Sequence, residues 1–339
     1  MLYLCYFLHI LLGLIRRFIG TFATVDNFLL GLNLTKVLIN DNMTLLGLKR
    51  RDFRWKKHDK KKVGLFMDVE EKEALLKARN YIVAKSNQIV QKSRYDFSMA
   101  EQRMIAYICS KIKPIEAIDR AKGVSFQLEY DFNILDYSRI CGIQDNGRVY
   151  EECKALLKGL RDKSMWLTLE DGSETTVGWL AKATTNKKSG IAKIKIDEDL
   201  APYLFDLQSK FLSYGLKNIL NMRSQYSIRL YELLKSYHDM KYRQADQKKI
   251  SWTINLDELK KKLMVDTIKS YENYKDFRKK VLEVSQKEIN ELTDISIYFE
   301  PITKGRKTEK VKFTIIMKSP MERYIANNKN DELLGSDFD

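Results

Sequence analysis

The chain has 339 residues, of which 44% are hydrophobic and 31% are charged, so it is neither a disordered chain nor a protein that lies wholly within a membrane. Its length leaves room for two domains with sizeable cores. The net charge of +15 and the pI near 9.4 favour an anionic partner, either nucleic acid or an acidic membrane surface.

Residues 1–66 differ in composition from the rest of the chain. Residues 1–15 are almost wholly apolar but are short for a membrane span, and they lack the features of a secretory signal. Residues 49–62 are densely basic, so one hypothesis is a membrane anchor with a polybasic flank. The preferred hypothesis is an atypical leader translated from an early start codon, with the functional protein beginning near Met67. Expression from Met67 alone is then expected to retain full activity.

After residue 77 the pattern becomes that of an ordered mixed domain. Residues 80–90 alternate enough for a strand or a short extended arm. Ser98 and Glu101 have capping-box spacing, which predicts a helix that ends near Pro114. The next expected elements are a strand at 124–132, helices at 134–143 and 149–163 with a turn at 145–147, a hairpin of 165–169 and 175–183 around Asp171-Gly172, a turn at 186–190 and a strand at 191–196.

Residues 256–292 contain two helical patterns on either side of a turn at 266–270. The second pattern starts at Tyr274 with a dense set of basic residues. Its helical wheel has an apolar face and an opposite face that is basic and carries amides. The apolar residues are Phe277, Val281, Leu282, Val284, Ile289 and Leu292, and the opposite residues are Lys279, Lys280, Glu283, Gln286, Lys287 and Asn290. Such a helix suits a DNA groove, and a solvated amphipathic helix is the simpler alternative.

Two stretches of the chain repeat the same order of elements at a near-constant spacing, which predicts an internal duplication. Residues 98–107 align with 224–233, residues 126–142 with 250–266, and Tyr150 with Tyr274. The first alignment places Arg103 on Arg229, and the second places Leu135 on Leu259. Residues 165–169 correspond to 295–299, so the third helix of the second copy is longer.

Each copy reads helix, strand, helix, turn, helix, strand, turn, strand, which is the order of a winged helix. The predicted fold class is therefore α+β, with tandem winged-helix (winged helix-turn-helix) domains. The third helix of such a domain enters the major groove, and the wing and first helix contact phosphates. The predicted segments are a leader at 1–66, a helix and arm at 67–97, winged-helix domains at 98–209 and 210–320, and an acidic flexible tail at 321–339.

The third helix of the first copy, residues 149–163, is less basic than its counterpart at 274–292. We therefore expect the second domain to read DNA. The first domain contacts the DNA backbone, a second subunit or both, and a purely structural or dimerising role is the alternative.

The segments NYIVAKSNQIVQKSRYDFSMAEQRMIAYICSKI at 80–112 and RSQYSIRLYELLKSY at 223–237 resemble the initiator (Rep) proteins of iteron-containing, theta-replicating plasmids. The resemblance covers roughly residues 80–318, and residues 1–66 depart from the family pattern. It implies a C-terminal domain that reads double-stranded origin repeats, the iterons, and an N-terminal domain that dimerises and contacts the iteron's other end.

Within such a family, monomers bind iterons, open the adjacent AT-rich DNA and recruit the host replication initiator and replicative helicase. Dimers repress their own gene. The implied protein is cytoplasmic, and its functional form has no membrane partner.

The candidate contacts follow from these positions. Lys275, Arg278 and Lys279 begin the reading helix, where Lys or Arg can pair with guanine O6 and N7. Tyr274 suits a phosphate or a thymine methyl. The remaining predicted DNA-binding residues are Arg223, Ser224 and Lys269 for phosphates, and Lys304, Arg306 and Lys307 on the wing, which is predicted over 297–317 with its turn at 304–307. Arg229 is either a DNA contact or a structural ion-pair partner, and we expect Trp166, Trp179 and Trp252 to lie in the core.

The sequence shows no residue pattern typical of an enzyme site, although acidic residues could hold Mg²⁺. The four cysteines show no CxxC pairing and are expected to be reduced thiols, and the three histidines have no metal-ligand spacing. Gly305-Arg-Lys-Thr308 has the wrong order for the end of a P-loop. No catalytic residue, cofactor or metal is predicted. The alternatives are a winged-helix transcription regulator and, less favoured, a Mg²⁺-dependent DNA-nicking enzyme.

Overall fold

The computed structural model describes residues 69–114, 122–123, 125–144, 147–207, 210–245 and 247–335. The chain divides into two units, Met1–Gly64 and Leu65–Asp339, and every described residue belongs to the second. The predicted leader and the start near Met67 lie outside the described residues, as do Cys5 and part of the turn at 145–147. Within the described part of the chain, no helix is long and apolar enough to cross a membrane.

The second unit begins with helix α3 (Val69–Arg79), strand β1 (Ile82–Ser86), helix α4 (Asn87–Lys92) and the short strand β2 (Ser93–Arg94). The strand predicted over 80–90 is thus correct for its first half only. The Ser86 hydroxyl accepts a hydrogen bond from the Gln88 amide at 3.1 Å and caps α4. This local cap converts the second half of the arm into a helix.

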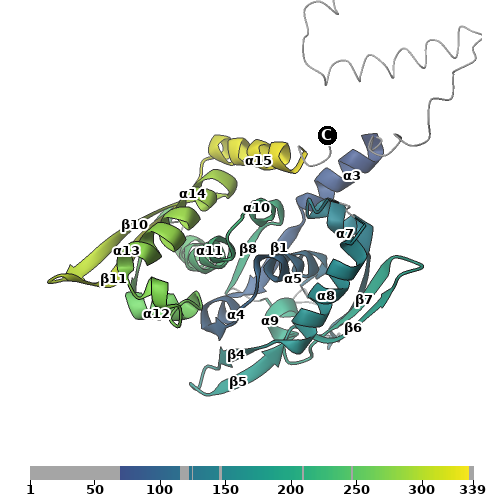
Figure 1. Cartoon of the computed structure of the whole chain (residues 1–339), viewed down its shortest axis with the longest axis horizontal. Helices are drawn as coiled ribbons and strands as arrows, with labels where there is room; N and C mark the ends of the chain where they lie inside the picture. Colours follow the sequence, from purple (N-terminus) through teal and green to yellow (C-terminus); the bar gives the residue numbers. More distant parts are fainter. Residues whose placement is uncertain are drawn as a thin grey trace, which may run out of the picture. The chain divides into compact units, whose positions relative to one another are not determined.

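The first winged-helix domain starts with α5 (Met99–Lys111). Its capping box is confirmed: the Ser98 amide donates to Glu101 Oε2 at 2.8 Å, and the Glu101 amide donates to the Ser98 hydroxyl at 3.3 Å. The helix-turn-helix consists of α7 (Ile134–Ile140) and α8 (Val149–Asp162). A three-stranded sheet completes the domain in the order β3-β7-β6, made of β3 (Glu129–Asn133), β6 (Leu180–Asn186) and β7 (Ile191–Ile196) (Figure 1).

The wing of the first domain differs from the prediction. The hairpin of β4 (Ser164–Thr168) and β5 (Glu174–Gly178) forms around Gly172 as expected, but the strand predicted over 175–183 is divided between β5 and β6. In addition, β4 pairs with β2 of the arm. The strand that pairs with β3 is β7, so the wing is β6–β7 and residues 165–169 do not correspond to 295–299. Alternation of apolar residues indicates a strand, but it does not identify the neighbouring strand in the sheet, because strand pairing is set by tertiary packing.

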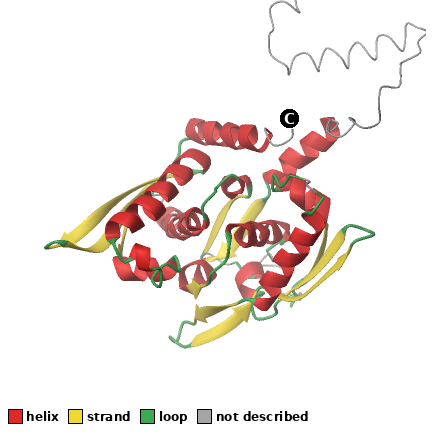
Figure 2. Ribbon diagram, viewed as in Figure 1, coloured by secondary structure: helices red, strands yellow, loops and turns green. Residues whose placement is uncertain are grey.

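The second winged-helix domain contains α11 (Gln225–Ala245), β9 (Lys249–Asn255) and α12 (Leu256–Lys262). Its third helix runs from Tyr274 to Leu292 as α13 (Tyr274–Phe277), a π-helical turn, η2 (Arg278–Leu282), and α14 (Glu283–Leu292), so it is longer than α8, as predicted. The wing is the hairpin β10 (Ile295–Lys304) and β11 (Lys307–Met317), and the sheet order is β10-β11-β9. Figure 2 shows the same mixture of helices and hairpins in both domains, so the predicted fold class is confirmed.

The turns inside the two helix-turn-helix units show how the copies align. Gly142 after α7 and Met264 after α12 both have positive φ, +64° and +54°. In each case the next amide donates back to a carbonyl near the helix end, at 2.8 and 3.0 Å. Gly142 therefore aligns with Met264 rather than with Asp266. The predicted match of Leu135 with Leu259 is wrong, because Leu135 is 45% exposed while Leu259 is fully buried.

A short connection joins the two domains and pairs with the arm. It comprises α9 (Pro202–Phe205), β8 (Phe211–Gly215) and α10 (Lys217–Leu220), and β8 runs antiparallel to β1. Arg229 of α11 donates to the Ser93 carbonyl at 2.9 Å and to the Tyr95 hydroxyl at 3.0 Å. Arg229 is therefore a buried structural residue, held by neutral acceptors rather than by an ion pair.

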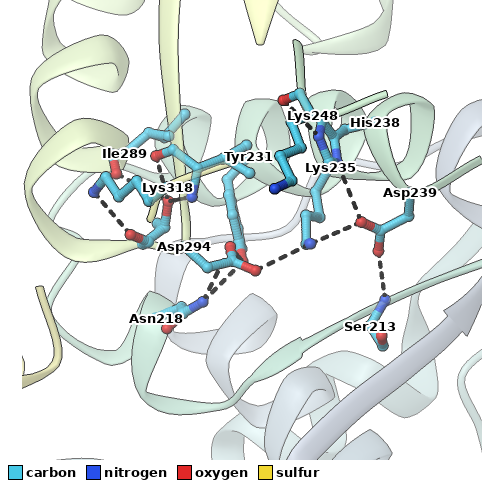
Figure 3. Close-up of polar contacts among 12 residues, drawn as sticks. Ser213, Asn218, Tyr231, Lys235, His238, Asp239, Lys248, Ile289, Asp294 and Lys318 are labelled. Carbon is cyan, nitrogen blue, oxygen red and sulfur yellow. Dashed lines mark hydrogen bonds and ion pairs between the residues drawn. The ribbon is translucent and has the colours of Figure 1, made fainter. Parts of the chain in front are cut away.

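A buried network of charged groups surrounds Lys235 of α11 (Figure 3). The Lys235 Nζ lies 2.7 Å from Asp239 Oδ1 and 3.0 Å from Asp294 Oδ2. The other oxygen of Asp239 accepts a hydrogen bond from the Ser213 amide of β8 at 3.2 Å, and Asp294 accepts one from the Tyr231 hydroxyl at 2.8 Å. Because Asp294 lies between α14 and β10, this network ties the end of the third helix to α11 and β8.

The C-terminal segment forms helix α15 (Pro320–Gly335), which corrects the prediction of a flexible tail. The Ser319 amide donates to Glu322 Oε2 at 2.8 Å and the Glu322 amide donates back to Ser319, giving a second capping box with Pro320 at its start. The side-chain oxygen of the buried Asn330 accepts a hydrogen bond from the Asn221 side-chain amide at 2.9 Å. These contacts fix the helix against the second domain.

Two of the three tryptophans predicted to lie in the core are packed as expected. Trp179 is buried, and Trp252 stacks on Tyr237 with ring centroids 4.4 Å apart. Trp166 is 53% exposed on β4, so its prediction as a core residue is wrong. Cys109, Cys141 and Cys153 are free and buried, and burial raises the pKa of each thiol to about 12.

Candidate DNA interface

The start of the third helix carries four of the predicted DNA-binding residues, namely Tyr274, Lys275, Arg278 and Lys279. Asn273 caps it, accepting a hydrogen bond from the Lys275 amide at 2.9 Å. Lys275, Arg278 and Lys279 are exposed, whereas Phe277 is fully buried beneath them. This packing holds the first turn while leaving its cations accessible to a ligand.

A groove of about 890 Å³ lies between α12, the start of the third helix and the wing turn. Its lining brings together Tyr274, Lys275, Arg306 and Lys307, which are separated by some thirty residues in the sequence. Three acidic residues, Asp257, Asp266 and Glu272, also border it. The groove is thus lined by cations from both the helix and the wing, as expected of a winged helix that holds DNA.

The wing turn has Gly305 with φ of +61°, and the flanking strand residues Lys304 and Lys307 pair directly. Positive φ at the first turn position is the geometry of a tight two-residue hairpin, for which glycine is suited. The side chains of Lys304, Arg306 and Lys307 are all exposed at this tip. Lys304 lies 3.9 Å from Glu309, and Lys269 is exposed on the short 3₁₀ turn Lys269–Tyr271.

The orientation of Tyr274 does not suit the phosphate contact that was predicted for it. Its ring is half-buried against the core, and its hydroxyl is buried without a hydrogen-bond partner among the described residues. Burial raises the pKa of this hydroxyl. The hydroxyl is therefore not exposed to a phosphate in this structure.

Arg223 and Ser224 lie apart from the groove, at the start of α11. Their backbone amides donate to the Glu288 carboxylate at 2.9 and 3.4 Å, and the Ser224 hydroxyl accepts from the Tyr226 amide at 3.2 Å. Glu288 follows Tyr274 by fourteen positions, or roughly 20 Å along a helix. A carboxylate thus occupies the backbone amides of two residues that were predicted to contact phosphates.

The side-chain amides on the third helix make hydrogen bonds to the wing strand β10. Gln286 and Asn290 each donate to the Ile297 carbonyl of β10 at 3.0 Å, and the Ile297 amide donates to Asn290 at 2.7 Å. These side chains hold the wing against the helix, so their predicted place on a DNA-facing surface is wrong. Val284, predicted on the apolar face, is 38% exposed.

Two exposed cations in this region were not predicted. Lys261 borders the groove described above and an adjoining one of about 540 Å³ that also contains Arg94 and Lys307. The basic run at 260–262 could have indicated Lys261 as part of this basic surface, whereas nothing in the sequence around Arg94 indicates such a role. Lys260 is buried and donates to the Glu272 carbonyl at 3.2 Å, so only part of that run faces solvent.

No group of three or more His, Cys, Asp or Glu side chains in the described residues is arranged to hold a metal ion.

Comparisons with known proteins agree with the fold. Residues 82–235 match the family described as "Initiator Replication protein, WH1", and residues 255–315 match "Initiator Rep protein, WH2". A replication initiation protein of Escherichia coli is 26% identical over 262 residues, which cover 76% of each chain. The PI protein of Escherichia coli is 29% identical over 168 residues, covering 46% of this chain and 52% of its own.

A solved structure gives the corresponding likeness in three dimensions. The crystal structure of the Pi initiator protein in complex with iteron DNA has a TM-score of 0.54 and 20% sequence identity, and the match covers 71% of this chain and 99% of that one.

Proposed function

Because this chain belongs to the family of initiator replication proteins, we propose that it starts plasmid replication by binding repeated origin sequences through its second winged-helix domain. The observation that carries this proposal is the groove in which Lys275 of the third helix meets Arg306 and Lys307 of the wing. The iteron DNA in the similar Pi structure supports the same class of ligand for this chain.

We further propose that the bound protein opens adjacent AT-rich DNA and recruits the host replication initiator and replicative helicase. The first winged-helix domain dimerises and contacts the DNA backbone, and the dimer represses its own gene. The net charge of +15 supports a polyanionic partner.

Footprinting on the DNA that flanks the gene tests this function. An initiator protects several direct repeats of about 20 base pairs, which is two helical turns. A single protected operator would favour a transcription regulator of the same fold. Strand cleavage by the purified chain with Mg²⁺ would favour the nicking enzyme.

Replacing Arg278 by alanine is expected to weaken binding to a repeat by about 1–3 kcal/mol and to relax base preference at one position, because a guanidinium fork is lost from a guanine edge. Titrations against duplexes with single base-pair changes measure both effects. Arg323→Ala on α15 is the matched control, since that arginine is exposed but lies outside the interface. An unchanged base preference in Arg278→Ala would remove Arg278 from the set of base contacts.

Replacing Lys307 by alanine is expected to weaken binding to all sequences alike, because a wing lysine contacts phosphates. The slope of log affinity against log salt should become shallower by about one. Binding measured at several salt concentrations with repeat and scrambled duplexes gives this slope. Lys329→Ala, at a half-exposed lysine paired with Glu291, should leave this slope unchanged. A selective loss on the repeat alone would show base contact instead.

A further inference from the structure

The third helix contains a π-helical turn at the point where its basic residues are concentrated. The Glu283 amide donates to the Arg278 carbonyl, five residues back, instead of the usual four. The extra residue shifts the buried face, so that Val281, Leu282 and Ser285 are buried while Val284 is exposed. Such turns are rare and occur frequently at functional sites.

The same two residues are also joined through their side chains. The Arg278 Nε donates to Glu283 Oε1 at 2.9 Å, and the two side chains are 52% and 45% exposed. In a regular α-helix, residues five apart point in directions that differ by roughly 140°. The ion pair therefore depends on the π-turn, which brings the two side chains to one face.

Among the described residues, this pair engages only the Nε atom of the Arg278 guanidinium and leaves its two Nη groups open to a ligand. Glu283 accepts from the Nε atom, so the two terminal Nη groups keep the fork that matches guanine O6 and N7. A carboxylate beside the arginine also repels phosphate oxygens, which disfavours a backbone contact at this position.

We propose that Glu283 is a positioning residue that directs Arg278 toward a base edge and away from the DNA backbone. This inference rests on the proposed function, because it assumes that the third helix reads DNA. The π-turn supplies the geometry, and the ion pair restricts the arginine before DNA arrives, so less conformational freedom is lost on binding.

An ion pair between exposed side chains usually contributes little to stability, so the test needs a second exposed ion pair on the same helix as a control. Glu291 provides that comparison. It lies on the same helix and pairs with Lys329 at 2.8 Å. Its side chain is 40% exposed, similar to the 45% of Glu283. The partner, Lys329, belongs to α15, away from the wing groove.

The test uses the full chain and two duplexes: one enriched by the wild type from a random pool, and one with that sequence scrambled. Glu283→Gln is expected to bind the scrambled duplex more tightly, because a negative charge is removed, and to bind the enriched duplex no better. The ratio of the two affinities should then fall about tenfold. Glu291→Gln should keep the wild-type ratio, and adding Glu283→Gln to Arg278→Ala should lower that variant's ratio no further.

Three outcomes overturn the inference. If Glu283→Gln keeps the wild-type ratio, or raises both affinities equally, Glu283 acts only as a surface charge. If Glu291→Gln lowers the ratio as much, the effect is not specific to Arg278. If the wild type enriches no sequence, specific readout itself fails, and this result separates failure of the proposed function from failure of the positioning role. Thermal unfolding of each variant should match the wild type, because all substituted side chains are half-exposed.

Discussion

Replacing Lys235 by methionine is expected to lower the free energy of unfolding by about 3–5 kcal/mol at neutral pH. The substitution leaves the carboxylates of Asp239 and Asp294 without their shared cation in a buried site (Figure 3). Burial alone would lower the pKa of Lys235, but attraction to Asp294 and Asp239 outweighs it and raises the pKa. The lysine is therefore charged in the folded protein, and its loss is costly.

The pH dependence of this effect has a definite sign. Burial would raise the pKa of Asp239, but the His238 ring nitrogen at 3.5 Å and the charge of Lys235 lower the pKa below its ordinary value. A carboxyl group whose pKa is lowered by folding adds stability at neutral pH. This stability is lost as the pH falls through the pKa of the group in the folded protein. Without Lys235 this contribution shrinks, so the unfolding free energies of the two proteins should converge in acid.

Urea unfolding at about pH 7 and about pH 3 measures both expectations. The matched control is Lys158→Met, which breaks an exposed pair between Lys158 and Asp162 and should change stability by less than about 0.5 kcal/mol. Equal stability of Lys235→Met and the wild type at neutral pH would contradict the role assigned to this network.

Replacing Phe277 by alanine is expected to cost about 3–5 kcal/mol of stability and to weaken binding to a repeat sequence more than binding to scrambled DNA. Phe277 is fully buried under the first turn of the third helix, where the Lys260 Nζ lies 5.6 Å from its ring centroid. The cavity would loosen the turn that presents Lys275 and Arg278. Specific contacts need fixed positions, whereas general attraction to phosphates does not.

Chemical denaturation and duplex titration of Phe277→Ala give the two effects separately. Val284→Ala is the control on the same helix, because Val284 is partly exposed although its sequence position predicted burial. It should change stability by about 0.5 kcal/mol or less. If Phe277→Ala destabilised the protein but kept the full preference for the repeat, the first turn would not be the reading element.

Features that depend on neighbouring residues were predictable from the sequence. The capping box of Ser98 and Glu101 and the tight wing turn at Gly305 each involve a few consecutive positions, and both form as expected. A second capping box, Ser319 with Glu322, has the same spacing in the sequence, within a segment whose acidic composition predicted a flexible tail. Local capping was the better guide to α15.

Features that depend on distant partners were not predictable in the same way. The helical wheel placed Gln286 and Asn290 opposite the apolar face, but it could not show that β10 covers them at Ile297. The π-turn has no composition signal, so the regular period misplaced Val284. Likewise, nothing near β4 in the sequence identifies β2 as its partner.

The most direct test of the central claim is an equilibrium titration of the full chain with a duplex carrying the direct repeats and with a scrambled duplex, at several salt concentrations. We predict that the repeat binds about a thousandfold or more tightly, and that both affinities fall as salt rises. Equal affinity for the two duplexes at every salt concentration would contradict sequence-specific reading by the second winged-helix domain.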